Sequence, residues 1–160
     1  MSRLRVGYVG VSFPTYFAEE FDQYNRAIAG LEALAQELDF ELVPIPYGLT
    51  DDSQVESATR ELQAQQIDFL LVEAAACAAG DPIIALSKVA PRLGIWATPD
   101  PYQEGDIKIH GVVVLNQYAS IIKRYLRHQD LPYKWFYGHV ETETFRKRFA
   151  ITIRSLQAIK

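Results

Sequence analysis

The sequence predicts an α/β protein built on a parallel sheet, because short apolar segments alternate with longer amphipathic ones along its 160 residues. Five apolar segments have the length of strands, and a segment with helical periodicity follows each of them. The third of these segments ends in Phe-Leu-Leu-Val, as expected of a strand whose two faces are both covered by helices. Hydrophobic residues make up 49% of the chain, enough for the core of a single domain spanning residues 1–160.

The chain begins with a predicted strand and a long predicted helix. Residues 4–10 form the strand, which ends in glycine. Across residues 15–38, apolar side chains recur at spacings of four and three, and this pattern predicts one buried face of a helix. The recurring residues are Phe17, Phe21, Tyr24, Ile28, Leu31, Ala35 and Leu38.

The second strand and second helix are shorter. Residues 40–44 predict the strand, and two prolines and a glycine within residues 44–48 predict a loop after it. Ser53 and Glu56 then fit a capping box, in which the serine oxygen accepts a backbone N–H and the glutamate reaches back. This motif predicts a helix that runs to about Gln65.

The third and fourth strands enclose a short helix. Residues 67–72 and residues 92–97 predict the strands, and residues 82–89 predict the helix between them. A long loop with two prolines, a glycine and three acidic residues follows at residues 98–110.

The last third of the chain contains a helix around residues 115–125, a strand at residues 134–138 and a helix from about residue 145 to the end. Right-handed crossovers between parallel strands place helices on both faces of the sheet. The predicted fold is therefore a three-layer, five-stranded, flavodoxin-like or Rossmann-like domain. By analogy with such folds, we expect the strand order 2-1-3-4-5.

Composition excludes several classes of function. The chain has 16 basic and 20 acidic residues, a net charge of −4 that argues against binding nucleic acid. Its one cysteine, Cys77, permits no intrachain disulfide bond. The first residues lack the apolar stretch and the cleavage site of a signal peptide, and no apolar run is long enough for a membrane span. We therefore expect a cytoplasmic protein without a membrane partner.

Ligands of such sheets bind at the carboxyl ends of the strands. The loop after the first strand lacks the glycine pattern of a dinucleotide fold, the lysine of a nucleotide-binding loop and the composition of a flavin loop. The acidic pair of a phosphate-accepting receiver domain is also absent there.

The sequence predicts no catalytic residue and no metal site in this chain. His110, His128 and His139 are scattered, and no two of them share a helix face. No Asp/His pair is evident, so we expect no hydrolytic centre. Asp100 and Glu104 lie in the long loop, where a solvated acidic segment is a better interpretation than a carboxylate pair.

Aromatic and polar residues do follow the predicted strands. Trp96 ends the fourth strand, Thr98 and Tyr102 come next, Tyr16 follows the first strand, and His139 follows the fifth. Aromatic faces and hydroxyl groups are what a sugar site requires. The alternative for Trp96 is packing in the core.

Two segments of the sequence resemble the L-fucose/L-arabinose isomerase family. The first runs from Leu-Gly-Ile-Trp-Ala-Thr-Pro-Asp-Pro at residues 93–101, through Gly105, to Val-Leu-Asn-Gln-Tyr at residues 114–118. The second is Pro-Tyr-Lys-Trp-Phe-Tyr-Gly-His at residues 132–139, which is similar to the segment that closes the family's N-terminal domain. The order of the predicted elements agrees with that domain over nearly the whole chain.

This resemblance implies carbohydrate metabolism and a metal-dependent aldose–ketose isomerase that uses Mn²⁺. The family's metal ligands belong to later domains, so we expect this domain to bind no cofactor and to be inactive alone. Its implied role is to wall the sugar pocket, commonly that of a neighbouring subunit in a homo-oligomer. The implied substrate-side residues are Trp96, Thr98, Tyr102 and Asn116, with Tyr16 and His139 as outer candidates.

The chain stops where the family's second domain would begin, so we expect it to be part of a longer enzyme. Two alternatives remain: a stand-alone module that binds a sugar or sugar phosphate without catalysis, and an oligomerisation module without a ligand. A metal-independent sugar affinity would indicate the first of them, and a large apolar patch without a pocket would indicate the second.

Overall fold

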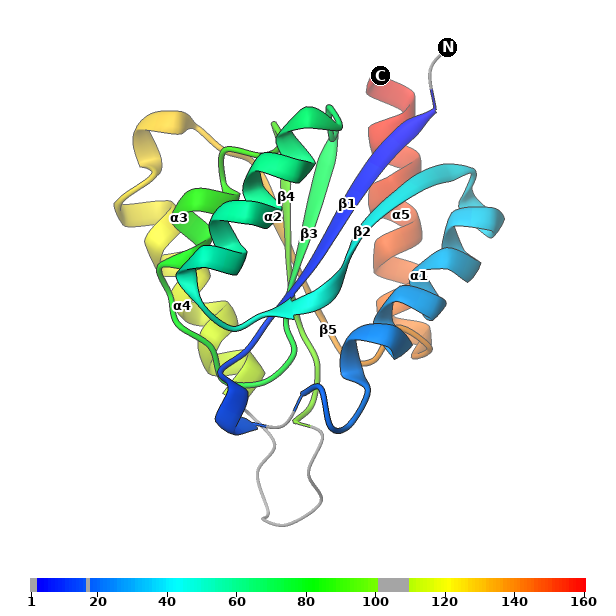
Figure 1. Ribbon diagram of the computed structural model, residues 1–160. Helices are drawn as coiled ribbons and strands as arrows, with labels where there is room; N and C mark the ends of the chain where they lie inside the picture. Colours follow the sequence, from blue (N-terminus) through cyan, green and yellow to red (C-terminus); the bar gives the residue numbers. More distant parts are fainter. Residues whose placement is uncertain (1–2, 17, 101–109) are drawn as a thin grey trace.

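The computed structural model describes residues 3–16, 18–100 and 110–160. It confirms the three-layer α/β fold, with a five-stranded, all-parallel sheet in the order β2-β1-β3-β4-β5 (Figure 1). The strands are β1 (Leu4–Val11), β2 (Phe40–Leu49), β3 (Phe69–Ala74), β4 (Leu93–Ala97) and β5 (Tyr133–Tyr137).

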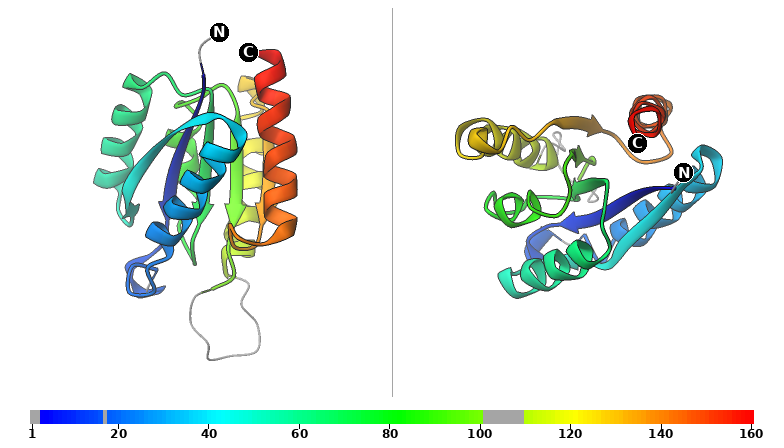
Figure 2. Two further views of the ribbon diagram at one scale, coloured as in Figure 1. Left: turned by 90° about the vertical axis from the view of Figure 1, so that its right-hand side faces the viewer. Right: turned by 90° about the horizontal axis from the view of Figure 1, so that it is seen from above.

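Helices cover both faces of the sheet (Figure 2). Helices α1 (Gln23–Leu38) and α5 (Glu143–Ile159) pack on one face, and α2 (Asp52–Ala64), α3 (Pro82–Leu86) and α4 (His110–Arg124) pack on the other. Two 3₁₀ turns, η1 (Pro14–Tyr16) and η2 (Arg127–Gln129), complete the elements of the described segments. The connections after β1 and β3 leave on opposite faces, so the strand order reverses between these two neighbours. Such a point opens a crevice at the carboxyl ends of the strands.

The core beneath α1 and α5 is largely aromatic. Trp96 on β4 is 1% exposed, and its ring centroid lies 4.5 Å from that of Phe145 on α5. The indole Nε1 of Trp96 donates a hydrogen bond of 2.7 Å to the carbonyl oxygen of Gly138. Phe145 in turn stacks on Phe149, with centroids 5.4 Å apart. These contacts hold α5 against β4 and β5.

Strand β2 is longer than expected. The structure extends it through Pro44 and Pro46, where the sequence predicts a loop, to Leu49, which pairs with Val11. A register shift in the pairing with β1 accommodates the irregular segment. Proline is tolerated here because β2 is an edge strand, and a missing N–H on its outer side costs no sheet hydrogen bond.

The starts of two helices also differ from expectation. Helix α1 begins at Gln23 rather than near Thr15, after Asp22 with a left-handed φ of 55°. The cap of α2 is Asp51, whose side chain accepts a hydrogen bond from the Gln54 N–H at 2.9 Å. The predicted capping box is therefore wrong, and Ser53 instead donates its hydroxyl to Asp51. Asp51 lies two residues earlier and offers the same chemistry with a carboxylate.

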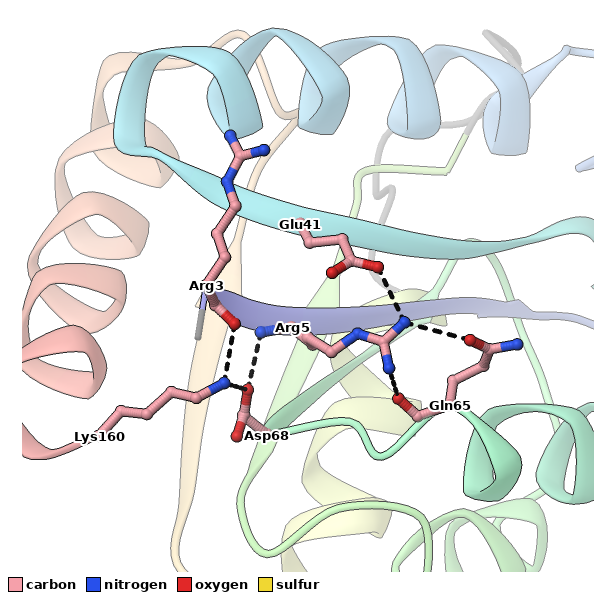
Figure 3. Close-up of polar contacts among 6 residues, drawn as sticks. All are labelled: Arg3, Arg5, Glu41, Gln65, Asp68 and Lys160. Carbon is pink, nitrogen blue, oxygen red and sulfur yellow. Dashed lines mark hydrogen bonds and ion pairs between the residues drawn. The ribbon is translucent and has the colours of Figure 1, made fainter. Parts of the chain in front are cut away.

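A polar network joins the amino-terminal ends of the strands to the last residue of the chain (Figure 3). Asp68 accepts hydrogen bonds from the Arg5 backbone N–H at 2.8 Å and from Lys160 Nζ at 2.5 Å. The Arg5 guanidinium donates to Glu41 Oε1 at 2.8 Å and to the carbonyl oxygen of Gln65. One cluster thus connects β1, β2, the segment between α2 and β3, and the end of α5.

We expect Asp68→Ala to lower the free energy of unfolding by about 1–2 kcal/mol, because it removes the acceptor of a backbone N–H and of an ammonium group. Urea unfolding monitored by circular dichroism measures this change. The matched control is Glu141→Ala, whose ion pair with Arg26 spans 3.8 Å and is exposed. That substitution should change the stability by less than about 0.5 kcal/mol. Equal effects of the two substitutions would contradict the structural role of Asp68.

Candidate functional site at the carboxyl ends of the strands

Helix α4 begins directly on the ends of β3 and β4. A Cβ atom added to Gly111 would lie 2.8 Å from the Thr98 carbonyl oxygen and 2.9 Å from that of Ala74. Only glycine permits this close approach of the helix to the strand ends. The contact brings His110, at the first turn of α4, back to the residues that follow β4.

Asp100 and His110 form a pair at this edge. Asp100 Oδ2 lies 2.9 Å from His110 Nδ1 and accepts the His110 backbone N–H at 3.1 Å. The Asp100 side chain is fully buried, whereas that of His110 is 40% exposed. The sequence-based expectations of a solvated Asp100 and of no Asp/His pair are therefore wrong.

The geometry of this pair suits acid–base or hydrogen-bonding chemistry. A carboxylate that is hydrogen-bonded to Nδ1 fixes the orientation of an imidazole ring. The second oxygen, Oδ1, is buried and has no hydrogen-bond partner within the described part of the chain.

Tyr16 and Cys77 extend the pair toward the ends of β1 and β3. The Tyr16 ring centroid lies 5.2 Å from that of His110, with the two planes inclined by 59°. A hydrogen bond with the Cys77 thiol raises the pKa of Tyr16. The loops that carry these residues are joined by a 2.7 Å hydrogen bond from the Phe13 N–H to the Cys77 carbonyl oxygen.

A carboxyl group is buried next to this cluster. Glu73, near the end of β3, is 1% exposed. It accepts hydrogen bonds from the Tyr8 hydroxyl and, at 3.1 Å, from Thr98 Oγ1. Burial raises the pKa of Glu73 from 4.5 to about 7, although both hydrogen bonds oppose the shift. Glu73 therefore exchanges a proton near neutral pH.

A small pocket lies above Glu73, between α1 and the segment after β5. Its volume of about 10 Å³ is close to the space that one water needs. Gln23 closes one side, with its Nε2 3.4 Å from the Pro99 carbonyl oxygen. Charged and polar side chains surround the opening, and they belong to Arg26, His139 and Glu141.

The structure brings together three of the six predicted site residues, because Trp96, Thr98 and His139 all line the small pocket above Glu73. Trp96 is in the core, so it is not available to stack on a sugar, and packing in the core is the correct interpretation. Thr98 is buried and bonded to Glu73. Asn116 is exposed on α4. Tyr102 lies outside the described residues.

Tyr16 and His139 do lie at the predicted edge, but in different places. Tyr16 packs against His110, whereas His139 lines the pocket above Glu73. The described part of the site thus consists of two neighbouring polar clusters, which residues 98–100 connect. One cluster contains Tyr16, Asp100 and His110, and the other contains Glu73 and His139.

Sequence reasoning missed Glu73, Gln23 and the Asp100–His110 pair. The sequence does contain a pattern that could have identified Glu73, because it is the one charged residue in the apolar run from residue 69 to residue 79. A charge in a strand that is buried on both faces needs a partner or a shifted pKa. Gln23 carried no such signal, since a glutamine near a helix start is ordinary.

The fold and the site together define a flavodoxin-like α/β domain with a polar, titratable site at the point where the strand order reverses. The sequence matches no family model and no curated protein.

Residues 3–16, 18–100 and 110–160 bring together no cluster of three or more His, Cys, Asp or Glu side chains that fits a metal ion. None of the helices in these segments has the length and apolar character of a membrane span.

Proposed function

We propose that this chain is the N-terminal, substrate-side domain of a metal-dependent aldose–ketose isomerase of the fucose/arabinose type, and that it acts within a homo-oligomer. The observation that carries the proposal is the Asp100–His110 pair next to Tyr16, at the edge of the sheet where ligands of this fold bind. Both segments that resemble the isomerase family contribute to this edge, one with Asp100 and the other with His139.

The side chains suit the recognition of a polyhydroxylated substrate. His110 presents its half-exposed imidazole ring at this edge, and Asp100 holds the ring in place through Nδ1. Tyr16 offers an aromatic face and a hydroxyl group beside the imidazole. Asp100 is thus a positioning residue, and His110 and Tyr16 are the contacts.

The Mn²⁺ of such enzymes supplies charge stabilisation of the ene-diol when it is bound. The described residues of this chain do not fit that ion, because Asp100 is already committed to His110 and to the start of α4. No step assigned to this chain therefore runs through the metal.

The second candidate function is a stand-alone module that binds a sugar or sugar phosphate without catalysis. It is favoured by the fact that Tyr16, Asp100 and His110 come from one chain and already contact one another. A ligand held by these groups alone would need no residues from another domain and no metal.

The test is Mn²⁺-dependent isomerisation of L-fucose and L-arabinose by the native polypeptide that contains this sequence. We expect His110→Asn to lower kcat/KM by about tenfold or more, since it removes a contact to the reacting sugar. The matched control is His128→Asn in the exposed turn η2, which should leave kcat/KM unchanged.

The outcomes separate the two functions. The binding module would replace the isomerase if no isomerisation is detected and the 160-residue chain nevertheless binds a sugar. In that case His110→Asn should weaken the sugar binding, and metal chelators should leave it unchanged. Equal activity of the His110 and His128 variants would remove His110 from the site.

A further inference from the structure

The two edges of the sheet differ in their capacity to accept another strand. Strand β5 lies at one edge and, among the described strands, pairs with β4 alone (Figure 2). Strand β2 lies at the other edge, where Pro44 and Pro46 supply no N–H groups. An unpaired edge with its backbone groups intact is a template for a further strand. Of the two edges, β5 is the one suited to strand addition.

Basic residues are concentrated in the segment of the sequence that contains β5 and α5. Residues 123–160, which include the end of α4, β5 and α5, contain nine basic and three acidic residues. The preceding 122 residues contain seven basic and 17 acidic residues. Arg146 and Lys160 pair with Glu37 and Asp68. Exposed basic residues remain on β5 and α5, namely Lys134, Lys147, Arg148 and Arg154, and their charge favours an anionic partner.

Exposed aromatic residues accompany this charge. Trp135 and Tyr137 on β5 are 47% and 43% exposed. The guanidinium of Arg148, on α5, lies 4.3 Å from the centroid of the Trp135 ring. Both Trp135 and Tyr137 lie on the same face of the strand, because side chains two residues apart point the same way.

An apolar cavity of about 200 Å³ opens where β5 begins. Its walls come from β3, β4, β5 and α5, and they are mostly aliphatic or aromatic. The apolar side chains that line it are Phe69, Leu93, Tyr133, Ile151, Leu156 and Ile159. The exposed Ile151 and Ile159 leave this cavity accessible from solvent. It has the position and lining to take an apolar side chain from a strand laid along β5.

We propose that β5 is a docking edge for an extended, acidic polypeptide segment, which adds as a sixth strand and inserts an apolar side chain into this cavity. Strand pairing requires a peptide backbone, so the edge suits a polypeptide better than a nucleic acid. The basic helix α5 selects acidic side chains in the segment. A second copy paired through its own β5 would bring two basic edges together. The inference is independent of the proposed isomerase function.

The probe is a seven-residue peptide that alternates glutamate with valine and leucine. Binding is followed by ¹⁵N–¹H NMR of the 160-residue chain, using the Trp135 indole signal and the hydrogen exchange of the β5 amides. We expect the peptide to shift β5 signals and to slow exchange along β5. It should bind at least about tenfold more tightly than either of two control peptides. One control has lysine in place of glutamate, and the other has N-methyl groups on alternate residues, which remove the backbone N–H donors.

Matched variants test the edge itself. Arg148→Glu and Lys134→Glu, both at exposed positions, should weaken peptide binding about fivefold or more each. Arg60→Glu makes the same charge change on α2 and should leave binding unchanged. Three outcomes overturn the proposal: equal binding of the N-methylated peptide, tighter binding of a ten-residue oligothymidylate at the same edge, or no β5 shift at millimolar acidic peptide.

Discussion

Trp96→Ala is expected to lower the free energy of unfolding by about 4 kcal/mol, because it empties a large volume in a closely packed aromatic core. The indole contacts Phe145 and Tyr8, with ring centroids 4.5 and 6.3 Å away. Its loss also leaves the Gly138 carbonyl oxygen without the hydrogen bond from Nε1. Urea unfolding, monitored by circular dichroism, measures the change.

The matched control is Trp135→Ala, the other tryptophan of the chain. Trp135 is 47% exposed and contacts the Arg148 guanidinium, so its removal should cost about 1 kcal/mol or less. Similar losses for both variants would contradict the placement of Trp96 in the core. Any loss of activity in Trp96→Ala is then expected to follow the loss of folded protein rather than a change in sugar affinity.

The stability of the protein is expected to fall by about 3 kcal/mol as the pH rises from 4.5 to 7, owing to Glu73 alone. In this window the unfolded chain loses the Glu73 proton, whereas the folded protein keeps it, so rising pH favours the unfolded state. Below pH 4.5 both states hold the proton, and above pH 7 both have lost it, so the contribution is constant outside the window.

Glu73→Gln should remove this part of the pH dependence and stabilise the protein at pH 8, because the amide never ionises. Unfolding at several pH values between 4 and 8 provides the measurement. The exposed Glu61→Gln on α2 serves as the control and should retain the slope of the original sequence. An unchanged slope in Glu73→Gln would show that Glu73 does not hold its proton in the folded state.

Most of the fold could be predicted from the sequence. Hydrophobic periodicity identified all five strands and the helices between them, since burial on one or two faces leaves a direct pattern in the residue order. The errors fall where a tertiary contact overrides local preference. Pairing with β1 extends β2 through Pro44 and Pro46, and Asp51 rather than Ser53 caps α2.

Less of the candidate site could be predicted. The edge at which the strand ends meet follows from the parallel topology, and the binding of a ligand there stays a prediction. The position of Tyr16 at this edge followed from the same rule. The pairing of Asp100 with His110 did not, since the two residues flank a long loop and lie ten positions apart.

The sequence by itself determined the class of fold, the order of its elements and the edge at which a ligand is expected, because these depend on patterns that are local along the chain. Only the tertiary structure decided which side chains meet at that edge. It placed Trp96 in the core and raised the pKa of Glu73, since both outcomes depend on what the other strands and helices cover. It also brought Asp100 to His110, because Gly111 lets α4 start directly on the strand ends.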